Sequence, residues 1–126
     1  MKLVIVTATI DMPRAIGCIN SWEDHATHPL HVYIVRQGDG SAGWEEVAGT
    51  HFYDVPEILG TVPAFAIGVQ KALKDGADII ACLHDDLEIE QDGWDVDVIR
   101  LFKACPRAGL CGFGGAKGLG ADDIYQ

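Results

Sequence analysis

The sequence predicts an α/β fold with three layers, α/β/α, in which helices cover both faces of a mainly parallel sheet. Five short apolar runs recur along the 126-residue chain, and they lack the strict polar–apolar alternation of half-exposed strands. Segments with apolar residues at helical spacing fall between several of these runs. Strand–helix alternation of this kind is typical of a parallel sheet with right-handed crossovers.

The expected strands coincide with the apolar runs. The first two runs are the richest in Val, Ile and Leu, and the third is weaker because it carries polar residues. The fourth ends directly in charged residues, and the fifth is short and contains two glycines. In chain order these strands are Leu3–Ala8, Leu30–Val35, His51–Val55, Ile79–Leu83 and Ala108–Gly112.

Three helices are expected between and after the strands. Their apolar faces comprise Ile16, Ile19 and Trp22 in Pro13–Trp22; Phe65, Val69, Ala72 and Leu73 in Val62–Lys74; and Trp94, Val98, Leu101 and Phe102 in Gly93–Cys105. Pro13 suits a first helical turn, Gly76 marks a stop, and Pro106 ends the last helix. Two long glycine-rich stretches, Arg36–Gly49 and Gly112–Gly120, are expected to be binding loops or lids.

Length and composition limit the class of protein. With 48% hydrophobic residues, the chain is expected to form one domain over residues 1–126. A net charge of −10 argues against nucleic-acid binding, although a divalent cation can still bring a nucleotide to an acidic site. No apolar run approaches the roughly 20 residues of a transmembrane helix, and no signal peptide is expected.

The four cysteines show no Cys-x-x-Cys spacing and no accompanying histidine cluster that would complete a zinc site. They are Cys18, Cys82, Cys105 and Cys111. Three of them lie in apolar stretches, so buried free thiols are expected, and with them a cytoplasmic location. Four histidines are expected to be structural or exposed: His25, His28, His31 and His51.

The strongest functional signal is the apolar run that ends in His84-Asp85-Asp86. Ionised side chains are costly inside a core, so carboxylates at the tip of a buried strand usually face a cleft. Carboxylate oxygens suit Mg²⁺ or Mn²⁺ bound together with substrate phosphates. Because adjacent residues of an extended chain point in opposite directions, one of Asp85 and Asp86 would face the metal and the other could reach a sugar hydroxyl. The alternative is an ordinary acidic turn after a strand.

Other polar segments are less specific. Three alternating acidic residues after the pair are expected to form a solvated face: Glu88, Glu90 and Asp92. Asp39, in a Gly-Asp-Gly-Ser turn, could contact a base or ribose, and this turn is also common without function. Lys117 could meet a phosphate, but neither a P-loop nor a dinucleotide fingerprint is present. A Ser–His–Asp hydrolase is disfavoured, because no Gly-x-Ser-x-Gly elbow occurs.

Over residues 2–115, the chain resembles the N-terminal, nucleotide-sugar-binding half of GT-A glycosyltransferases, nearest to glycosyltransferase family 2. The likeness rests on an opening strand, a turn, a frame of small residues before the fourth strand, a variant of the DxD metal motif, and a tryptophan at the start of the following helix. In this chain they are Leu3–Thr9; Asp39-Gly40-Ser41; Gly60, Ala64, Gly68, Ala72 and 76–80; His84-Asp85-Asp86; and Gly93-Trp94.

The resemblance implies a metal-dependent transferase that moves a sugar from a UDP- or GDP-sugar to an acceptor. It implies Mn²⁺ or Mg²⁺ bound by Asp86, with Asp85 contacting the ribose or supporting the metal, and Asp39 addressing the nucleobase. The base pocket would be lined, largely through backbone, by Thr7, Ala8 and Thr9. The metal would act as a Lewis acid that neutralises charge on the departing nucleoside diphosphate.

The chain also departs from the family pattern. Gly38 stands where the family often has the first of two aspartates, and Phe65-Ala66 stands where it often has Arg-Asn. Asp122 and Asp123 are the only late acidic candidates for a catalytic base, so the catalytic residue is unknown and the acceptor half is expected to be missing. Two alternatives stay open: an inactive GT-A-like module for binding or oligomerisation, and a small metal-dependent nucleotidyltransferase or phosphohydrolase.

Overall fold

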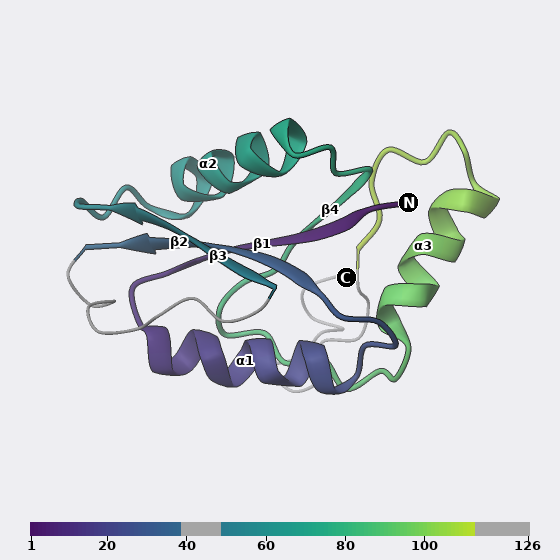
Figure 1. Ribbon diagram of the computed structural model, residues 1–126, viewed down its shortest axis with the longest axis horizontal. Helices are drawn as coiled ribbons and strands as arrows, with labels where there is room; N and C mark the ends of the chain where they lie inside the picture. Colours follow the sequence, from purple (N-terminus) through teal and green to yellow (C-terminus); the bar gives the residue numbers. More distant parts are fainter. Residues whose placement is uncertain (39–48, 113–126) are drawn as a thin grey trace, which may run out of the picture.

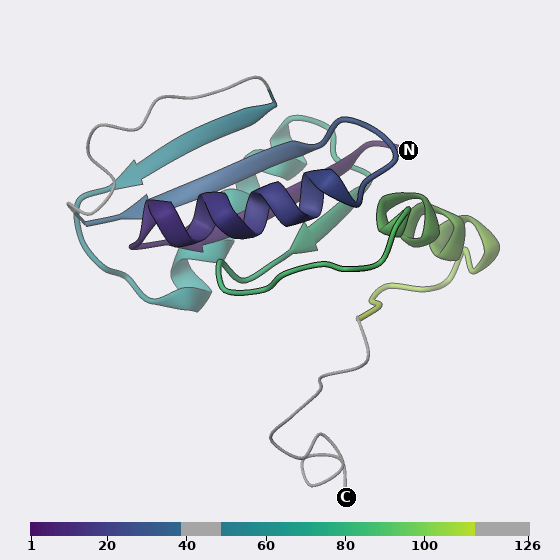
Figure 2. The same ribbon diagram turned by 90° about the horizontal axis from the view of Figure 1, so that it is seen from below.

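The computed structural model describes residues 1–38 and 49–112, and its centre is a four-stranded parallel sheet (Figures 1 and 2). In chain order the elements are β1 Leu3–Thr9, α1 Met12–Asp24, β2 His31–Gln37, β3 Thr50–Val55, α2 Thr61–Lys74, β4 Ile79–Cys82 and α3 Trp94–Ala104. The strand order is β3-β2-β1-β4. The predicted α/β class, the parallel sheet, the first four strands and the three helices are therefore confirmed.

Helix α1 covers one face of the sheet and α2 covers the other, whereas α3 lies at the end where β1 begins (Figure 1). The core on the α1 side contains Ile5 and Trp22 and extends to Trp94 of α3. The core on the α2 side contains Val6 and Ala72. This arrangement is compatible with three layers. None of the helices in the described ranges is both long and apolar enough to cross a membrane.

Strand β1 is central because both of its faces are apolar. Val4, Ile5 and Val6 are fully buried, as expected of a continuous apolar run in a parallel sheet. Ile5 belongs to the core beneath α1, whereas Val4 and Val6 belong to the core beneath α2. Since side chains alternate along a strand, Thr7 and Thr9 lie on the α1 side with Ile5.

Helix α2 packs on the sheet through small residues. Ala64, Gly68 and Ala72 are buried, and their spacing of four places them on one stripe of the helix. A Cβ atom at Gly68 would lie 2.3 Å from Cγ1 of Val6, which is closer than two non-bonded carbon atoms approach each other, so only glycine fits there. The small-residue frame that contributes to the family resemblance therefore has a packing role in this fold.

The prediction of a fifth strand at Ala108–Gly112 is wrong. This segment has no regular structure, and Leu110 is 91% exposed. Its two glycines and its unburied leucine supply little side-chain packing to stabilise a strand. Within the described part of the chain, β4 therefore pairs with β1 alone. Strand β4 also ends at Cys82 rather than Leu83, although the Leu83 N–H still donates to the Val6 carbonyl at 3.0 Å.

Several predictions of burial are also wrong. Leu73 and Leu101 are 59% and 41% exposed, because the stripes of α2 and α3 that contact the core leave these side chains outside. Of the four cysteines only Cys18 is buried; Cys82 ends the edge strand and Cys105 follows the last turn of α3, so both are exposed. All four cysteines are free thiols, as predicted.

Candidate functional site

The carboxyl ends of β1 and β4 form a topological switch point. The chain passes from β1 to β2 on one side of β1, and β4 is later added on the other side. Such a reversal leaves a crevice outside the carboxyl ends of the two strands, where α/β proteins bind ligands. Thr9 is the last residue of β1, and Asp85 lies in the loop that follows β4.

The side chains of Thr9 and Asp85 meet across this switch point. The distance from Thr9 Oγ1 to Asp85 Oδ2 is 2.7 Å. The same hydroxyl lies 2.9 Å from the carbonyl oxygen of Asp11 and accepts a hydrogen bond from the Asp11 backbone N–H at 2.9 Å. A hydroxyl has one proton, and the ionised carboxylate is the stronger acceptor. Thr9 therefore donates to Asp85 and orients its carboxylate.

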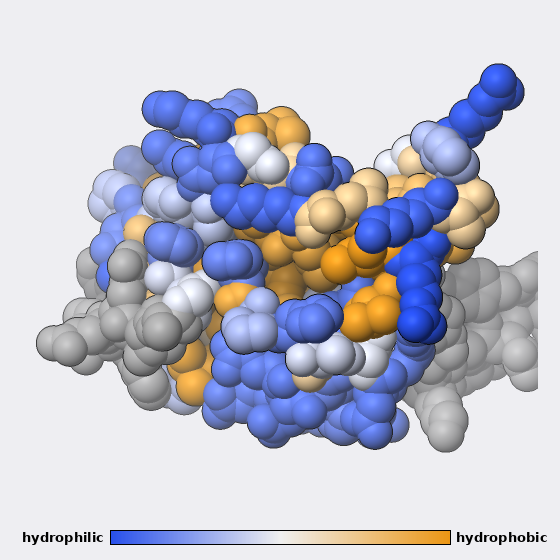
Figure 3. All heavy atoms as spheres, turned by 45° about the vertical axis from the view of Figure 1, so that its right-hand side comes forward, coloured by the Kyte–Doolittle hydropathy of each residue, from blue (hydrophilic) through white to orange (hydrophobic). Residues whose placement is uncertain are grey.

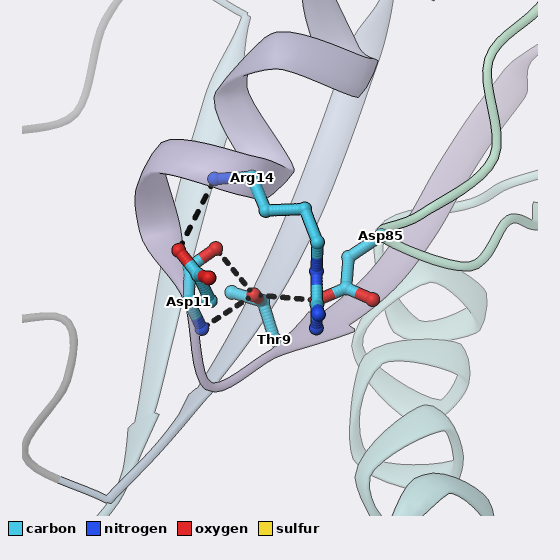
Figure 4. Close-up of polar contacts among 4 residues, drawn as sticks. All are labelled: Thr9, Asp11, Arg14 and Asp85. Carbon is cyan, nitrogen blue, oxygen red and sulfur yellow. Dashed lines mark hydrogen bonds and ion pairs between the residues drawn. The ribbon is translucent and has the colours of Figure 1, made fainter.

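Arg14 is the second partner of Asp85 (Figure 4). Its Nη2 lies 2.9 Å from the same Oδ2 atom, and the side chains of Arg14 and Asp85 are 48% and 14% exposed. The hydrogen bond and the charge of Asp85, with smaller contributions from Asp11 and Asp86, raise the pKa of Arg14 above its ordinary value, so the guanidinium stays charged. The other carboxylate oxygen of Asp85, Oδ1, accepts no hydrogen bond from the described residues.

The start of α1 places Arg14 at this site. The Asp11 side chain accepts a hydrogen bond from the Arg14 backbone N–H at 3.2 Å and caps the helix, which therefore begins at Met12 rather than at Pro13. Sequence reasoning did not identify Arg14. The available signal was a basic residue in the first turn of a helix that directly follows a parallel strand, where the helix dipole disfavours positive charge.

The two adjacent aspartates have different environments, but they do not lie on an extended strand tip as expected. They form a turn in which the Leu87 N–H donates to the His84 carbonyl at 3.2 Å. Asp85 turns into the switch point, whereas Asp86 is exposed and makes no hydrogen bond with the described residues. Asp86 is nevertheless near enough to raise the pKa of Arg14. His84 is exposed and packs edge-on against the Phe65 ring of α2, with 5.4 Å between ring centroids. The structure thus brings Asp85, rather than Asp86, into contact with β1.

The other predicted nucleotide-binding residues lie along β1 or outside the described residues. Thr7 is fully buried on the face of β1 that carries Thr9, and its Oγ1 has no hydrogen-bond partner within residues 1–38 and 49–112. A buried polar atom of this kind usually has a ligand or a water molecule beside it. Ala8 is half-buried on the opposite, α2 side. Asp39 lies outside the described residues, as do Lys117, Asp122 and Asp123.

The loop that carries both aspartates is attached to α1. The Trp22 indole N–H donates to the Leu87 carbonyl at 2.7 Å, and the Ile89 N–H donates to the Ser21 hydroxyl at 3.1 Å. The Trp94 indole N–H in turn donates to the Trp22 carbonyl at 2.9 Å. These bonds hold the loop after Asp86 against the helix. The acidic residues Glu88, Glu90 and Asp92 are exposed, as predicted.

A metal at this site would depend on ligands from a substrate. In the described ranges, no group of three or more His, Cys, Asp or Glu side chains could hold a metal ion. Mg²⁺ sites often use only one or two carboxylates, with phosphate oxygens and water completing the coordination. Asp85 with its available Oδ1, and the adjacent Asp86, fit this second type of site.

The opposite end of the molecule offers a different surface. An open cavity at the C-terminal end of α1 is lined by residues 26–31, with Glu23 and Gly49. Figure 3 turns the end of the molecule that carries α3 toward the reader and shows apolar surface (orange) between hydrophilic side chains (blue).

The histidines near the cavity are structural or exposed, as predicted: His25 contacts Asp92 at 2.6 Å, and His28 and His31 are exposed. His51 packs edge-on against the Tyr33 ring.

Both the strand order and the contact between Thr9 and Asp85 thus identify the switch point as the candidate site. No protein-family model matches the chain, and searches of curated proteins and of solved structures found no match either.

Proposed function

We propose that the chain binds a nucleoside diphosphate sugar at the carboxyl ends of β1 and β4, as the donor-binding part of a metal-dependent glycosyltransferase with a GT-A fold. The observation that carries this proposal is the hydrogen bond between Thr9 and Asp85, which joins the first strand to the DxD-like segment at the switch point. Nucleotides bind at this place in parallel α/β sheets, and the order β3-β2-β1-β4 occurs in sheets of nucleotide-binding proteins.

Each residue of the site has a role in the proposal. Asp85 and Asp86 hold Mn²⁺ or Mg²⁺ together with oxygens of the diphosphate. When bound, the metal neutralises charge on the departing nucleoside diphosphate. Thr9 fixes the orientation of Asp85, and the buried hydroxyl of Thr7, which has no hydrogen-bond partner among the described residues, supports an ordered water or a polar ligand beside β1. Ala8, whose side chain lies on the opposite face of β1, would contribute through its backbone alone, and Asp39 is assigned to the nucleobase on the family resemblance alone.

The composition supports the proposed surroundings of the protein. All four cysteines are free thiols, which are typical of a reducing compartment, and we propose the cytoplasm. The net charge of −10 favours a nucleotide that arrives with a divalent cation over a nucleic acid.

A second candidate function is an inactive GT-A-like module that binds a partner or a second copy of the chain. Phe65, where the family often has the arginine of Arg-Asn, is occupied in packing against His84. Among the described strands, β4 pairs on one side only, so its other edge is open to pairing. Dimerisation that depends on concentration, without any nucleotide binding, would favour this function.

Isothermal titration calorimetry tests the proposed function directly. UDP, GDP and their sugars are titrated into the protein with Mn²⁺, with Mg²⁺ and with EDTA. We expect at least one nucleotide to bind in a metal-dependent manner. The Asp85→Asn substitution should weaken this binding about tenfold or more, because interactions with charged groups contribute roughly 1.5–3 kcal/mol.

The matched control is Asp24→Asn, which removes the same charge at the opposite end of α1. It should leave nucleotide binding unchanged. The proposal is refuted if no nucleotide binds to the wild-type protein with either metal. It is also refuted if Asp85→Asn and Asp24→Asn weaken binding equally, because the effect would then come from net charge rather than from the site.

A further inference from the structure

We infer that Arg14 is a built-in counter-ion of this site: its guanidinium holds Asp85 while the site is empty and moves to the diphosphate when a nucleotide binds. This inference rests on the proposed function and adds a residue to which the family resemblance assigns no role. Arg14 would thereby couple the binding of the metal to the binding of the nucleotide.

The position of Arg14 in α1 needs a physical reason. A basic side chain in the first turn of a helix is disfavoured by the positive end of the helix dipole, and the first turn of α1 contains no acidic side chain. The opposing charges come from outside that turn. Asp85 contacts Arg14 at 2.9 Å, and Asp11 and Asp86 act on it at longer range. Three carboxylates around one guanidinium leave the site negative overall.

Arg14 is the movable partner in the ion pair, and Asp85 is the fixed one. The Arg14 side chain is 48% exposed, so it can turn away without uncovering a core. Asp85 is only 14% exposed and is also bound at 2.7 Å by Thr9, whose backbone belongs to the central strand. When Arg14 leaves, Asp85 therefore keeps its orientation. Figure 4 shows Arg14 extending from α1 to Asp85, next to the contact between Asp85 and Thr9.

A divalent cation and Arg14 compete for the same carboxylate. Two positive charges about 4 Å apart repel each other even in water, so a cation bound to Asp85 favours departure of the guanidinium. A diphosphate then offers Arg14 a better acceptor, because guanidinium groups bind phosphate oxygens through paired N–H···O bonds. Arg14 should therefore weaken the binding of a metal alone and strengthen the binding of the nucleotide.

The Arg14→Gln substitution tests these opposite effects. Mn²⁺ alone is measured by the EPR signal of the free ion, and UDP at saturating Mn²⁺ is measured by calorimetry. Loss of one charge about 4 Å from the divalent cation should tighten Mn²⁺ binding about thirtyfold at the dielectric constant of water. Loss of the charge-assisted bonds should weaken UDP binding about tenfold. Arg14→Lys should bind Mn²⁺ like the wild type and UDP with intermediate affinity.

The matched control is Arg100→Gln on the exposed surface of α3, which should change neither affinity. A structural defect in Arg14→Gln would weaken both ligands, so opposite changes identify the counter-ion role. If Mn²⁺ and UDP bind to the wild type but Arg14→Gln weakens both or neither, the inference is wrong and the proposed function stands. If the wild-type protein binds UDP with neither metal, the proposed function and the inference both fail.

Discussion

Replacing Gly68 by alanine tests whether α2 packs on β1 as closely as the structure indicates. The added Cβ would lie 2.3 Å from Val6 Cγ1 and 3.4 Å from Val35 Cγ2, and Val6 is fully buried. Forcing an extra methyl group into a packed core costs about 1–3 kcal/mol, and so severe an overlap belongs at the upper limit. Alanine recovers about 1 kcal/mol of helix propensity relative to glycine. The net destabilisation should be about 2 kcal/mol.

The matched control is Gly17→Ala in α1. A Cβ there meets nothing within 4 Å, so only the propensity term applies and the variant should gain about 0.8–1 kcal/mol. Urea unfolding followed by circular dichroism measures both changes, and thermal unfolding should show Gly68→Ala melting about 6–10 °C lower. The packing argument is refuted if Gly68→Ala is as stable as the wild type, or if both variants shift in the same direction.

Three further predictions concern the supporting structure. Burial would raise the pKa of Asp95, but hydrogen bonds from backbone N–H groups, led by that of Thr27, lower it. Asp95 therefore stabilises the folded protein at neutral pH, and this contribution is lost as the pH falls below about 4. Asp95→Asn should lower the free energy of unfolding by about 1–2 kcal/mol at pH 7. In urea unfolding at several pH values, the free energy of unfolding of this variant should fall less with decreasing pH than that of the wild type, and an equal fall would contradict this reasoning. Trp22→Phe removes the bond to the Leu87 carbonyl and should speed hydrogen exchange in residues 84–89 but not in β1, whereas equal speeding in both would indicate global destabilisation. Burial and the bond to Asp75 raise the pKa of Tyr33 to about 12. Because the pKa of tyrosine in the unfolded chain is about 10, the free energy of unfolding should fall more between pH 10 and 12 in the wild type than in Tyr33→Phe, and equal falls would refute this.

The elements of the fold could be predicted because their signals are local. The apolar run of β1, the helical spacing in α1 and α2, and the glycine after α2 each specify a backbone conformation within a few residues. The errors arose where burial by distant elements decides the outcome. Ala108–Gly112 is apolar enough to suggest a strand, but Leu110 is 91% exposed, and Leu73 has helical spacing but lies outside the contact stripe of α2.

For the site, the sequence by itself determined that two carboxylates follow an apolar strand, since an apolar run followed by Asp85 and Asp86 can be recognised without a structure. Among the described strands it is an edge strand of which only Ile79 is buried, rather than the buried strand that was expected. Only the tertiary structure decided which of the two carboxylates turns toward β1 and what it contacts. Thr9 and Arg14 lie 76 and 71 positions from Asp85 in the chain. They reach it because β4 is placed beside β1 rather than beside β3, and no local periodicity specifies that order. The order of the strands depends on the packing of α1 and α2 on opposite faces of the sheet. It brings Thr9 and Arg14 to Asp85 and thereby orients the carboxylate of a residue that lies in an ordinary acidic turn.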